Sequence, residues 1–207
     1  MGIIVNVDEC IGCHACFIAC KQENQVSPNI QWNRIRKIED REKNIINYFR
    51  ASCQHCEDPA CLKVCPMKAV YKGPHGEILI DQDKCIACKA CLAACPYGMP
   101  MFNDRKLTSY YGAKQPLFSP SNPPTKNAQP GKAEHCTLCS HRLAKGKEPA
   151  CVEICPAKAL TLVDFDAPTK KQKKLLSKAV QLKAGVDTKP KVRYICSNMD
   201  FREVALK

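Results

Sequence analysis

The feature that most constrains this chain is the grouping of its cysteines. Sixteen of the 17 cysteines among 207 residues fall into four quartets, and Cys196 alone stands apart. Two quartets have the spacing C-x2-C-x2-C-x3-C, one has C-x2-C-x4-C-x3-C and one has C-x2-C-x11-C-x3-C. In chain order the quartets are Cys10, Cys13, Cys16 and Cys20; Cys53, Cys56, Cys61 and Cys65; Cys85, Cys88, Cys91 and Cys95; and Cys136, Cys139, Cys151 and Cys155.

Disulfides, zinc and iron–sulfur clusters are the three uses for so many thiols. Disulfide frameworks are typical of small secreted proteins, and the nine residues before Cys10 leave no room for a signal peptide. Two CxxC pairs would indicate zinc, but four quartets, three of them followed by proline, favour iron–sulfur clusters.

The formal net charge of +12 suggests, as an alternative, a zinc-stapled nucleic-acid-binding module. That count treats cysteine as neutral, whereas the ligands of a cluster are thiolates. Sixteen thiolates carry a charge of about −16, and four inorganic cores of roughly +2 each carry about +8. Together they contribute about −8, which brings the net charge to about +4. The basic excess then balances the clusters, and we expect no nucleic-acid partner.

The spacing itself suits a cubane cluster. A C-x2-C-x2-C loop can bring three thiolates to three irons of one 4Fe–4S cube, and it aims backbone amides at the sulfurs. The fourth cysteine has begun to leave the loop, so in two-cluster ferredoxins it ligates the other cluster, and the following proline marks the turn. We therefore expect Cys65 to bind a different cluster from Cys53, Cys56 and Cys61.

Short strands and helices are expected around the quartets. The sequence predicts strands at residues 3–7 and 159–164, a β-hairpin within residues 69–84, and a short helix opening before each last cysteine. Only KQENQ, after Cys20, continues such a helix convincingly. The predicted fold class is α+β, with two ferredoxin-like two-cluster units, one inserted within the other, and long loops.

Four segments follow from this organisation. They are residues 1–50, the N-terminal half of the first unit; 51–104, the inserted unit; 105–133, a Pro-rich insertion loop; and 134–207, the C-terminal half of the first unit with a basic tail. The loop is either a surface insertion or a docking loop whose apolar residues an interface would bury: Tyr110, Tyr111, Leu117 and Phe118. Residues 169–185 predict a basic helix with an inward face of Leu175, Leu176, Val180 and Leu182.

The remaining residues indicate no catalytic centre. Four histidines beside cysteine loops are expected to pack against clusters or donate hydrogen bonds: His14, His55, His135 and His141. His75 is expected to be exposed in a turn, and Cys196 to be a buried structural thiol. We find no Gly-rich phosphate loop or Ser-His-Asp pattern, and no apolar run of about 18 residues that could span a membrane. A chain whose metal sites are all closed by cysteine is suited to electron transfer, as a non-catalytic subunit.

The nested quartets resemble the electron-transfer iron–sulfur (four-cluster, beta) subunit of the DMSO reductase family of molybdopterin oxidoreductases. SCQHCEDPACLKVCP, CIACKACLAACPYGMP and HCTLCSHRLAKGKEPACVEICP resemble its second, third and fourth motifs. The insertion at 105–133 is longer than the family pattern, and Lys21 stands where proline would follow the first quartet.

The resemblance implies a relay of single electrons. Its partners would be a large catalytic subunit that holds molybdopterin with molybdenum or tungsten, and an integral-membrane quinone or haem subunit or another redox donor. It also implies cytoplasmic assembly, with the complex either membrane-associated or exported with a partner that bears a twin-arginine signal. The alternative is a polyferredoxin-type carrier subunit of a hydrogenase or a carbon monoxide-oxidising complex.

The resemblance further implies four 4Fe–4S ligand sets, in a nearly linear order from the molybdopterin side to the membrane side. These are Cys10, Cys13, Cys16 and Cys155; Cys20, Cys136, Cys139 and Cys151; Cys65, Cys85, Cys88 and Cys91; and Cys53, Cys56, Cys61 and Cys95. Glu57 and Asp58 are expected to lower the potential of the fourth cluster, and Arg142 and Lys145 to raise that of the second.

Overall fold

The computed structural model describes residues 1–104, 130–182 and 187–206. The four apolar residues expected to make a docking loop lie outside the described residues. They are Tyr110, Tyr111, Leu117 and Phe118.

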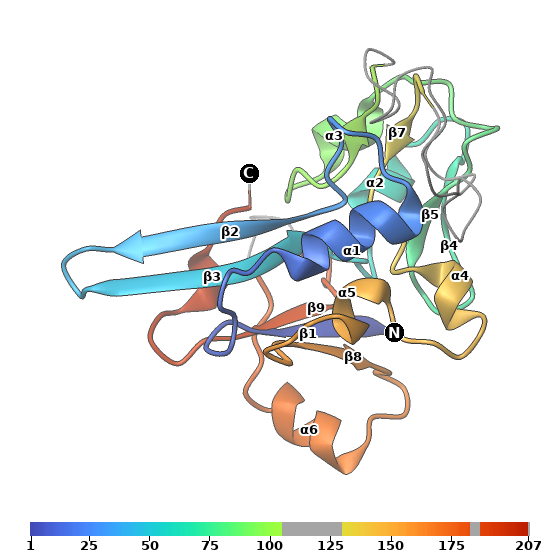
Figure 1. Cartoon of the computed structure of the whole chain (residues 1–207). Coiled ribbons are helices and arrows are strands. Elements are labelled where there is room, and N and C mark those ends of the chain that lie inside the picture. The colour runs from blue at the N-terminus through green and yellow to red at the C-terminus, as the bar shows by residue number, and fades with distance from the viewer. Residues whose placement is uncertain (105–129, 183–186, 207) are drawn as a thin grey trace, which may run out of the picture.

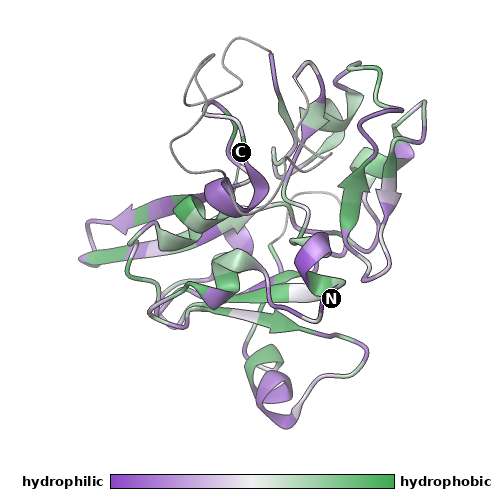
Figure 2. Cartoon of the chain, turned by 45° about the vertical axis from the view of Figure 1, so that its right-hand side comes forward, coloured by the Kyte–Doolittle hydropathy of each residue, from purple (hydrophilic) through white to green (hydrophobic). Residues whose placement is uncertain are grey.

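A three-stranded sheet joins the two ends of the chain. Strand β1 (Gly2–Asn6) lies in the middle, antiparallel to β8 (Leu160–Val163) and parallel to β9 (Val192–Ile195). Its residues Ile3 and Val5 are almost fully buried, which is why an apolar run forms this central strand. The strands predicted at 3–7 and 159–164 are thus confirmed, whereas β9 was not anticipated. Figure 2 shows the sheet as mostly hydrophobic.

A long two-stranded arm projects from this body, as Figure 1 shows. Strand β2 (Asn33–Asp40) pairs antiparallel with β3 (Ile45–Ser52). At the base of the arm the Phe49 side chain is buried and packs edge-on against the rings of Tyr194 and Phe201. The arm was not predicted, and its inner strand runs directly into the second cysteine quartet.

The middle of the chain forms smaller sheets. Strands β4 (Val70–Lys72) and β5 (Ile78–Ile80) form the hairpin predicted within residues 69–84. Strand β6 (Met101–Phe102) pairs with β7 (Ala133–Glu134), which brings the two sides of the Pro-rich segment together. The fold is mixed α/β with small sheets.

Short helices carry the third cysteine of each quartet, as predicted. They are α1 (Ala15–Asn24), α2 (Ala60–Lys63), α3 (Ala90–Ala94) and α5 (Ala150–Glu153). Only α1 continues beyond its quartet, while α4 (Ser140–Leu143) lies within the fourth one. Helix α1 packs against α5, and α2 packs against α3 (Figure 1). No helix in the described ranges is long and apolar enough to cross a membrane.

The predicted basic helix over 169–185 is too long. Helix α6 spans Lys170–Leu176 and begins at a capping box of Thr169 and Gln172. Beyond it Val180 exchanges two backbone hydrogen bonds with Tyr194, of 2.8 and 2.9 Å, so the chain has already left the helix there. A short 3-10 helix, η1 (Phe201–Glu203), lies near the C-terminus.

Candidate iron–sulfur sites

Four cavities are each lined by four cysteines of the quartets. Cavity A is lined by Cys10, Cys13, Cys16 and Cys155; cavity B by Cys20, Cys136, Cys139 and Cys151; cavity C by Cys53, Cys56, Cys61 and Cys95; and cavity D by Cys65, Cys85, Cys88 and Cys91. Each cavity takes three cysteines from one quartet and the last cysteine of another. In the described ranges, the four cavities included, no three His, Cys, Asp or Glu side chains converge as ligands of a single metal ion would.

The cavities follow one another in the order A, B, C, D. The Arg50 side chain lines both A and B. The Cys53 thiol of C interacts electrostatically with Cys136 of B, and Cys61 of C with Cys91 of D.

The expected order of the last two sets is therefore wrong. The set containing Cys53 was expected at the end of the row, but it lies inside it, because β3 leads from Arg50, beside B, directly into Cys53. Exposure agrees with this order: the exposed cysteines among the sixteen are Cys13 of A and Cys88 of D.

The walls of the cavities are largely apolar. Alongside its cysteines, cavity A is lined by Ile35 and Leu160, and cavity D by Ile80 and Ile86. Four thiols in an apolar wall match the donor set of a 4Fe–4S cluster, and such walls keep water away from it. The residues present therefore fit iron–sulfur clusters.

Burial makes these thiols reluctant to ionise. It raises the pKa of Cys16 and of Cys61 to about 12, with neighbouring thiols adding to the effect. For Cys91, burial and the thiolates of its own cavity raise the pKa to about 11. Without metal these three thiols therefore hold their protons at neutral pH, and cluster binding must release them.

Backbone amides point at the sulfurs, as the spacing predicted. Four N–H groups donate to cysteine Sγ atoms, namely His55 to Cys53 at 3.5 Å, Ala69 to Cys65 at 3.2 Å, Met99 to Cys95 at 3.5 Å and Leu138 to Cys136 at 3.4 Å. Such hydrogen bonds stabilise a reduced cluster and raise its potential.

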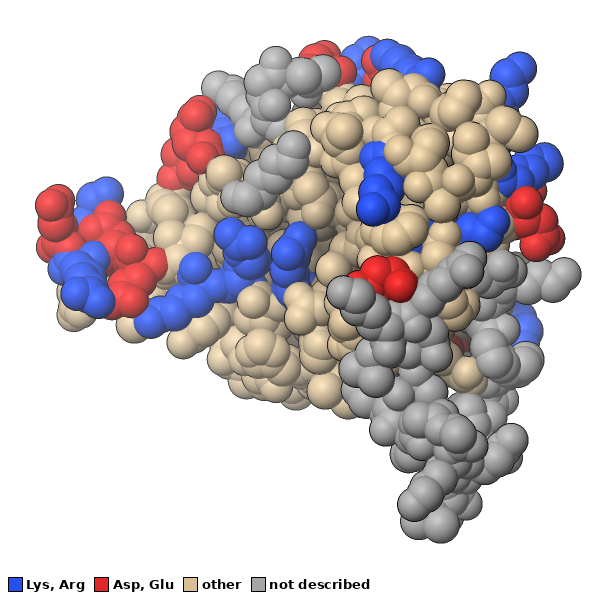
Figure 3. Space-filling model, turned by 90° about the horizontal axis from the view of Figure 1, so that it is seen from above, with Lys and Arg blue, Asp and Glu red and all other residues tan. Residues whose placement is uncertain are grey.

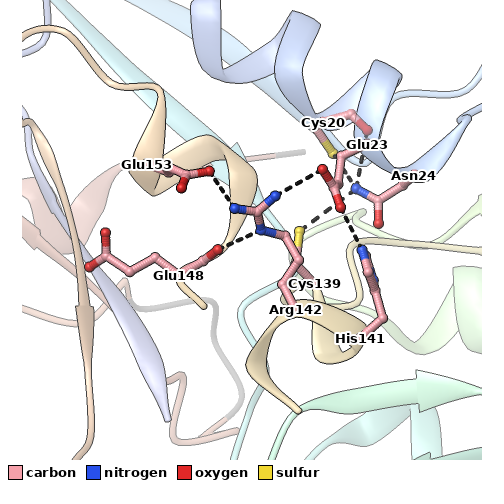
Figure 4. Close-up of polar contacts among 8 residues, drawn as sticks. All are labelled: Cys20, Glu23, Asn24, Cys139, His141, Arg142, Glu148 and Glu153. Carbon is pink, nitrogen blue, oxygen red and sulfur yellow. Dashed lines mark hydrogen bonds and ion pairs between the residues drawn. The ribbon is translucent and has the colours of Figure 1, made fainter. Parts of the chain in front are cut away.

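Side chains that the sequence did not single out also reach the sulfurs. The buried Asn24 amide lies 3.7 Å from the Sγ atoms of both Cys20 and Cys139 in cavity B (Figure 4). In cavity C the Cys56 Sγ lies 3.4 Å from Thr188 Oγ1, a hydroxyl that also bonds Tyr97 at 2.9 Å. An isolated polar residue in the sequence carries no signal of such a contact.

The charges expected to tune the clusters are already balanced. Arg142 pairs with Glu23 at 2.9 Å and with Glu153, joining α4 to α1 and α5 (Figure 4). The Lys145 side chain is exposed.

The acidic pair beside cavity C is compensated in the same way. Glu57 pairs with Lys191 and Lys72, whose hydrogen bonds lower its pKa to about 2, and Asp58 pairs with Lys63. Figure 3 likewise shows acidic and basic residues interspersed, notably at the tip of the arm.

Two histidines are buried beside cavity C. The His55 and His135 rings meet edge-on with centroids 6.3 Å apart, and burial lowers the pKa of both, so they are neutral. His55 Nδ1 accepts a hydrogen bond from the Ile78 amide, and the His135 ring bonds the Cys136 carbonyl. His141 bonds Glu23 at 2.8 Å. His135 lines cavity C, as expected of a residue that packs against a cluster. His141 forms a hydrogen bond, whereas His55 accepts one where donation was expected.

Three residues differ from expectation or extend it. His14 lines cavity A, as expected of a residue that packs against a cluster, but it is exposed, and its ring meets the Phe17 ring edge-on. His75 is half-buried, because its carbonyl accepts a hydrogen bond from the N-terminal ammonium group. Cys196 is half-buried where full burial was expected, and its Sγ lies 3.1 Å from Asn198 Oδ1.

The fold and cavities define an iron–sulfur electron carrier, and comparisons with known proteins agree. The family described as a 4Fe-4S dicluster domain matches residues 45–110 and 116–165, and a 4Fe-4S binding domain matches residues 7–23.

Relatives extend the likeness over the whole chain. The chain is 36% identical to the arsenate respiratory reductase iron-sulfur subunit of Shewanella sp. ANA-3, over 95% of this chain and 96% of that one. It is 34% identical to a chain of the anaerobic dimethyl sulfoxide reductase of Escherichia coli K12, over 92% and 86% of the two proteins. For a chain of the polysulfide reductase of Wolinella succinogenes the identity is 35%, over 92% and 91%.

The chain belongs to the family of iron–sulfur electron-transfer subunits of DMSO reductase-type molybdopterin oxidoreductases. The alternative, a carrier of a hydrogenase or carbon monoxide-oxidising complex, is not favoured by these relatives.

Proposed function

We propose that the chain is a non-catalytic subunit that binds four 4Fe–4S clusters, one in each of cavities A to D, and relays single electrons along them. The observation that carries the proposal is that each cavity is lined by four cysteines. When bound, a cluster supplies one-electron redox chemistry. The chain's own residues hold it through sulfur, exclude water from it and donate hydrogen bonds to its ligands.

The proposed ligand sets make two nested ferredoxin-like units. Cavities A and B use cysteines of residues 1–50 and 134–207, and cavities C and D use those of residues 51–104, with 105–133 as an insertion. Two observations support this division. Strand β1 and helix α1, in residues 1–50, pack against strand β8 and helix α5, in residues 134–207. Helices α2 and α3 pack against each other within residues 51–104.

The proposed partners contact the ends of the row. Cys13 and Cys88, the exposed cysteines of A and D, favour electron entry and exit there. Following the family pattern, the large molybdopterin subunit, with molybdenum or tungsten, lies at A. A membrane quinone or haem subunit, or another donor, lies at D. The complex would assemble in the cytoplasm and then be membrane-associated or exported with a twin-arginine-bearing partner.

Iron counts on cysteine-to-alanine variants test the ligand sets. The natively purified, anaerobic complex should hold about 16 iron atoms per chain, together with molybdenum or tungsten in the partner. Each ligand variant should lose about four. Cys155→Ala combined with Cys10→Ala, both in cavity A, should lose no more than either alone, whereas Cys155→Ala with Cys136→Ala should lose about eight. Cys196→Ala serves as the control and should lose none.

The opposite pattern would contradict the proposal. If each quartet binds its own cluster, Cys155 and Cys136 belong together, and their double variant loses one cluster instead of two. Zinc without iron in the native complex would remove the cluster assignment altogether. About 16 iron atoms with neither molybdenum nor tungsten would favour another redox complex.

A further inference from the structure

One basic side chain is buried between cavities A and B. Arg50, in β3, is 1% exposed, and the residue lines both cavities. Its Nη1 donates to Ser52 Oγ at 2.6 Å, and its Nη2 lies 3.6 Å from Cys136 Sγ. Among the described residues no carboxylate forms an ion pair with it.

A buried guanidinium needs a counter-ion, because an uncompensated charge in the interior costs several kcal/mol. In the described part of the chain, the groups that can supply this counter-charge are the cysteines of the two cavities, which become thiolates when a cluster is bound. An arginine guanidinium keeps its proton in proteins, and the sulfurs that interact electrostatically with Arg50 are those of Cys151, Cys136, Cys16 and Cys20. Arg50 is thus a permanent positive charge shared by both cavities.

We propose that Arg50 raises the reduction potentials of the clusters in cavities A and B, and so sets where electrons reside along the row. The inference rests on the proposed function, since it requires clusters in both cavities. Reduction adds one electron to a cluster, delivered by the neighbouring cluster. Arg50 keeps its proton throughout, and no bond forms or breaks. Its charge stabilises the extra electron on either side.

The expected size of the effect follows from Coulomb's law. A unit charge about 6 to 12 Å from the centre of a cluster, in a protein interior of effective dielectric about 20, changes the equilibrium constant for reduction by about 100- to 10-fold. For a one-electron couple that is about 60 to 120 mV, at 59 mV for each tenfold change. The charges of Arg142 and Glu57 should matter less, because each is paired and Glu57 is also half exposed.

The test compares Arg50→Gln, Arg50→Lys and a matched arginine in the intact anaerobic complex. Arg193, half-buried on β9 against the Phe165 ring, lines none of the four cavities, so Arg193→Gln is the control. Potentials of the individual clusters are measured by redox titration followed by electron paramagnetic resonance. Arg50→Gln should lower the potentials of the clusters in A and B by about 60 to 120 mV, which is a 10- to 100-fold change in the equilibrium constant for reduction. The potential of the cluster in D should not change. Arg50→Lys should keep most of the wild-type potentials, and Arg193→Gln should keep them all.

The outcomes separate the two proposals. Iron content of the wild-type complex tests the proposed function alone. Full iron in Arg50→Gln with unchanged potentials at A and B overturns the role of Arg50 while leaving the clusters in place. If Arg50→Gln loses iron, Arg50→Lys decides: retained iron and potentials support the role of the charge, and lost iron shows that the side chain only supports the fold.

Discussion

The aromatic cluster at the base of the arm should be the main stabilising contact between the arm and the body. Phe49 of β3 is 1% exposed. Its ring lies edge-on to Tyr194 of β9, with centroids 5.9 Å apart, and to Phe201 of η1, at 4.8 Å. Tyr194 and Phe201 stack on each other at 4.8 Å. One side chain therefore links the arm, the central sheet and the C-terminal segment.

Phe49→Ala should be strongly destabilising. Truncating a fully buried phenylalanine costs about 3–5 kcal/mol through lost transfer energy and the cavity left behind. The two edge-on pairs, worth about 0.5–1.5 kcal/mol each, are part of that cost and place the loss in the upper half of the range, near 4–5 kcal/mol. That is a large part of the 5–15 kcal/mol that typically stabilises a domain. Tyr71→Ala is the control, because Tyr71 is 43% exposed and should cost no more than about 0.5 kcal/mol.

The assay follows the visible absorbance of the clusters in denaturant under anaerobic conditions. Because unfolding releases the clusters, the measurable quantity is a rate of loss. If between half and all of the destabilisation appears in the unfolding rate, Phe49→Ala should lose its clusters about 30- to 5000-fold faster than wild type. A rate within about threefold of both wild type and Tyr71→Ala would refute the assigned role of Phe49.

Two further predictions concern a surface ion pair and a hydrogen bond to sulfur. Glu57 has a pKa near 2, so the stability it contributes is complete above its ordinary pKa of 4.5 and is lost as the pH falls through 2. Glu57→Gln should therefore lose its clusters faster than wild type at pH 6, and the difference should begin to shrink as the pH falls below 4.5; an unchanged difference would contradict this. Asn24→Leu should lower the potential of the cluster in cavity B. The equilibrium constant for its reduction should fall about fivefold, since one hydrogen bond is worth about 1 kcal/mol. Redox titration with full iron would show this, and an unchanged potential would exclude the contact.

Local pattern was sufficient where an element depends on its own residues. The hairpin at β4 and β5, the buried strands β1 and β8, and the short helices at the third cysteines could all be predicted. Helix α6 ends early because Val180 bonds to Tyr194, a partner fixed only in three dimensions. The arm was not predicted, because its strands mix charged and apolar residues and because Phe49 in it packs against Phe201, which lies far along the chain.

The site shows the same division. The spacing identified the sixteen cysteines as candidate ligands. It contains no information on how far apart the quartets lie in the fold, so the predicted order of C and D was reversed. Arg50 was missed for a related reason. A single arginine in the run INYFRASC looks like a surface residue of a strand, and only the fold reveals that both of its neighbours are cavities. The charged residues that the sequence did suggest, Glu57 and Arg142, are compensated by ion pairs.

Burial and charge along the row together indicate where electrons should collect. The cysteines at its two ends include exposed ones, which lets partners approach A and D, whereas Cys53, Cys56 and Cys95 of C are buried. A fixed cation serves A and B, while the charges near C are paired. Because a permanent charge favours the reduced state of its neighbours at any pH below its own pKa, the A and B end should hold electrons longer than the rest of the row. That bias suits the transfer of two electrons in succession between the row and the catalytic partner proposed at A.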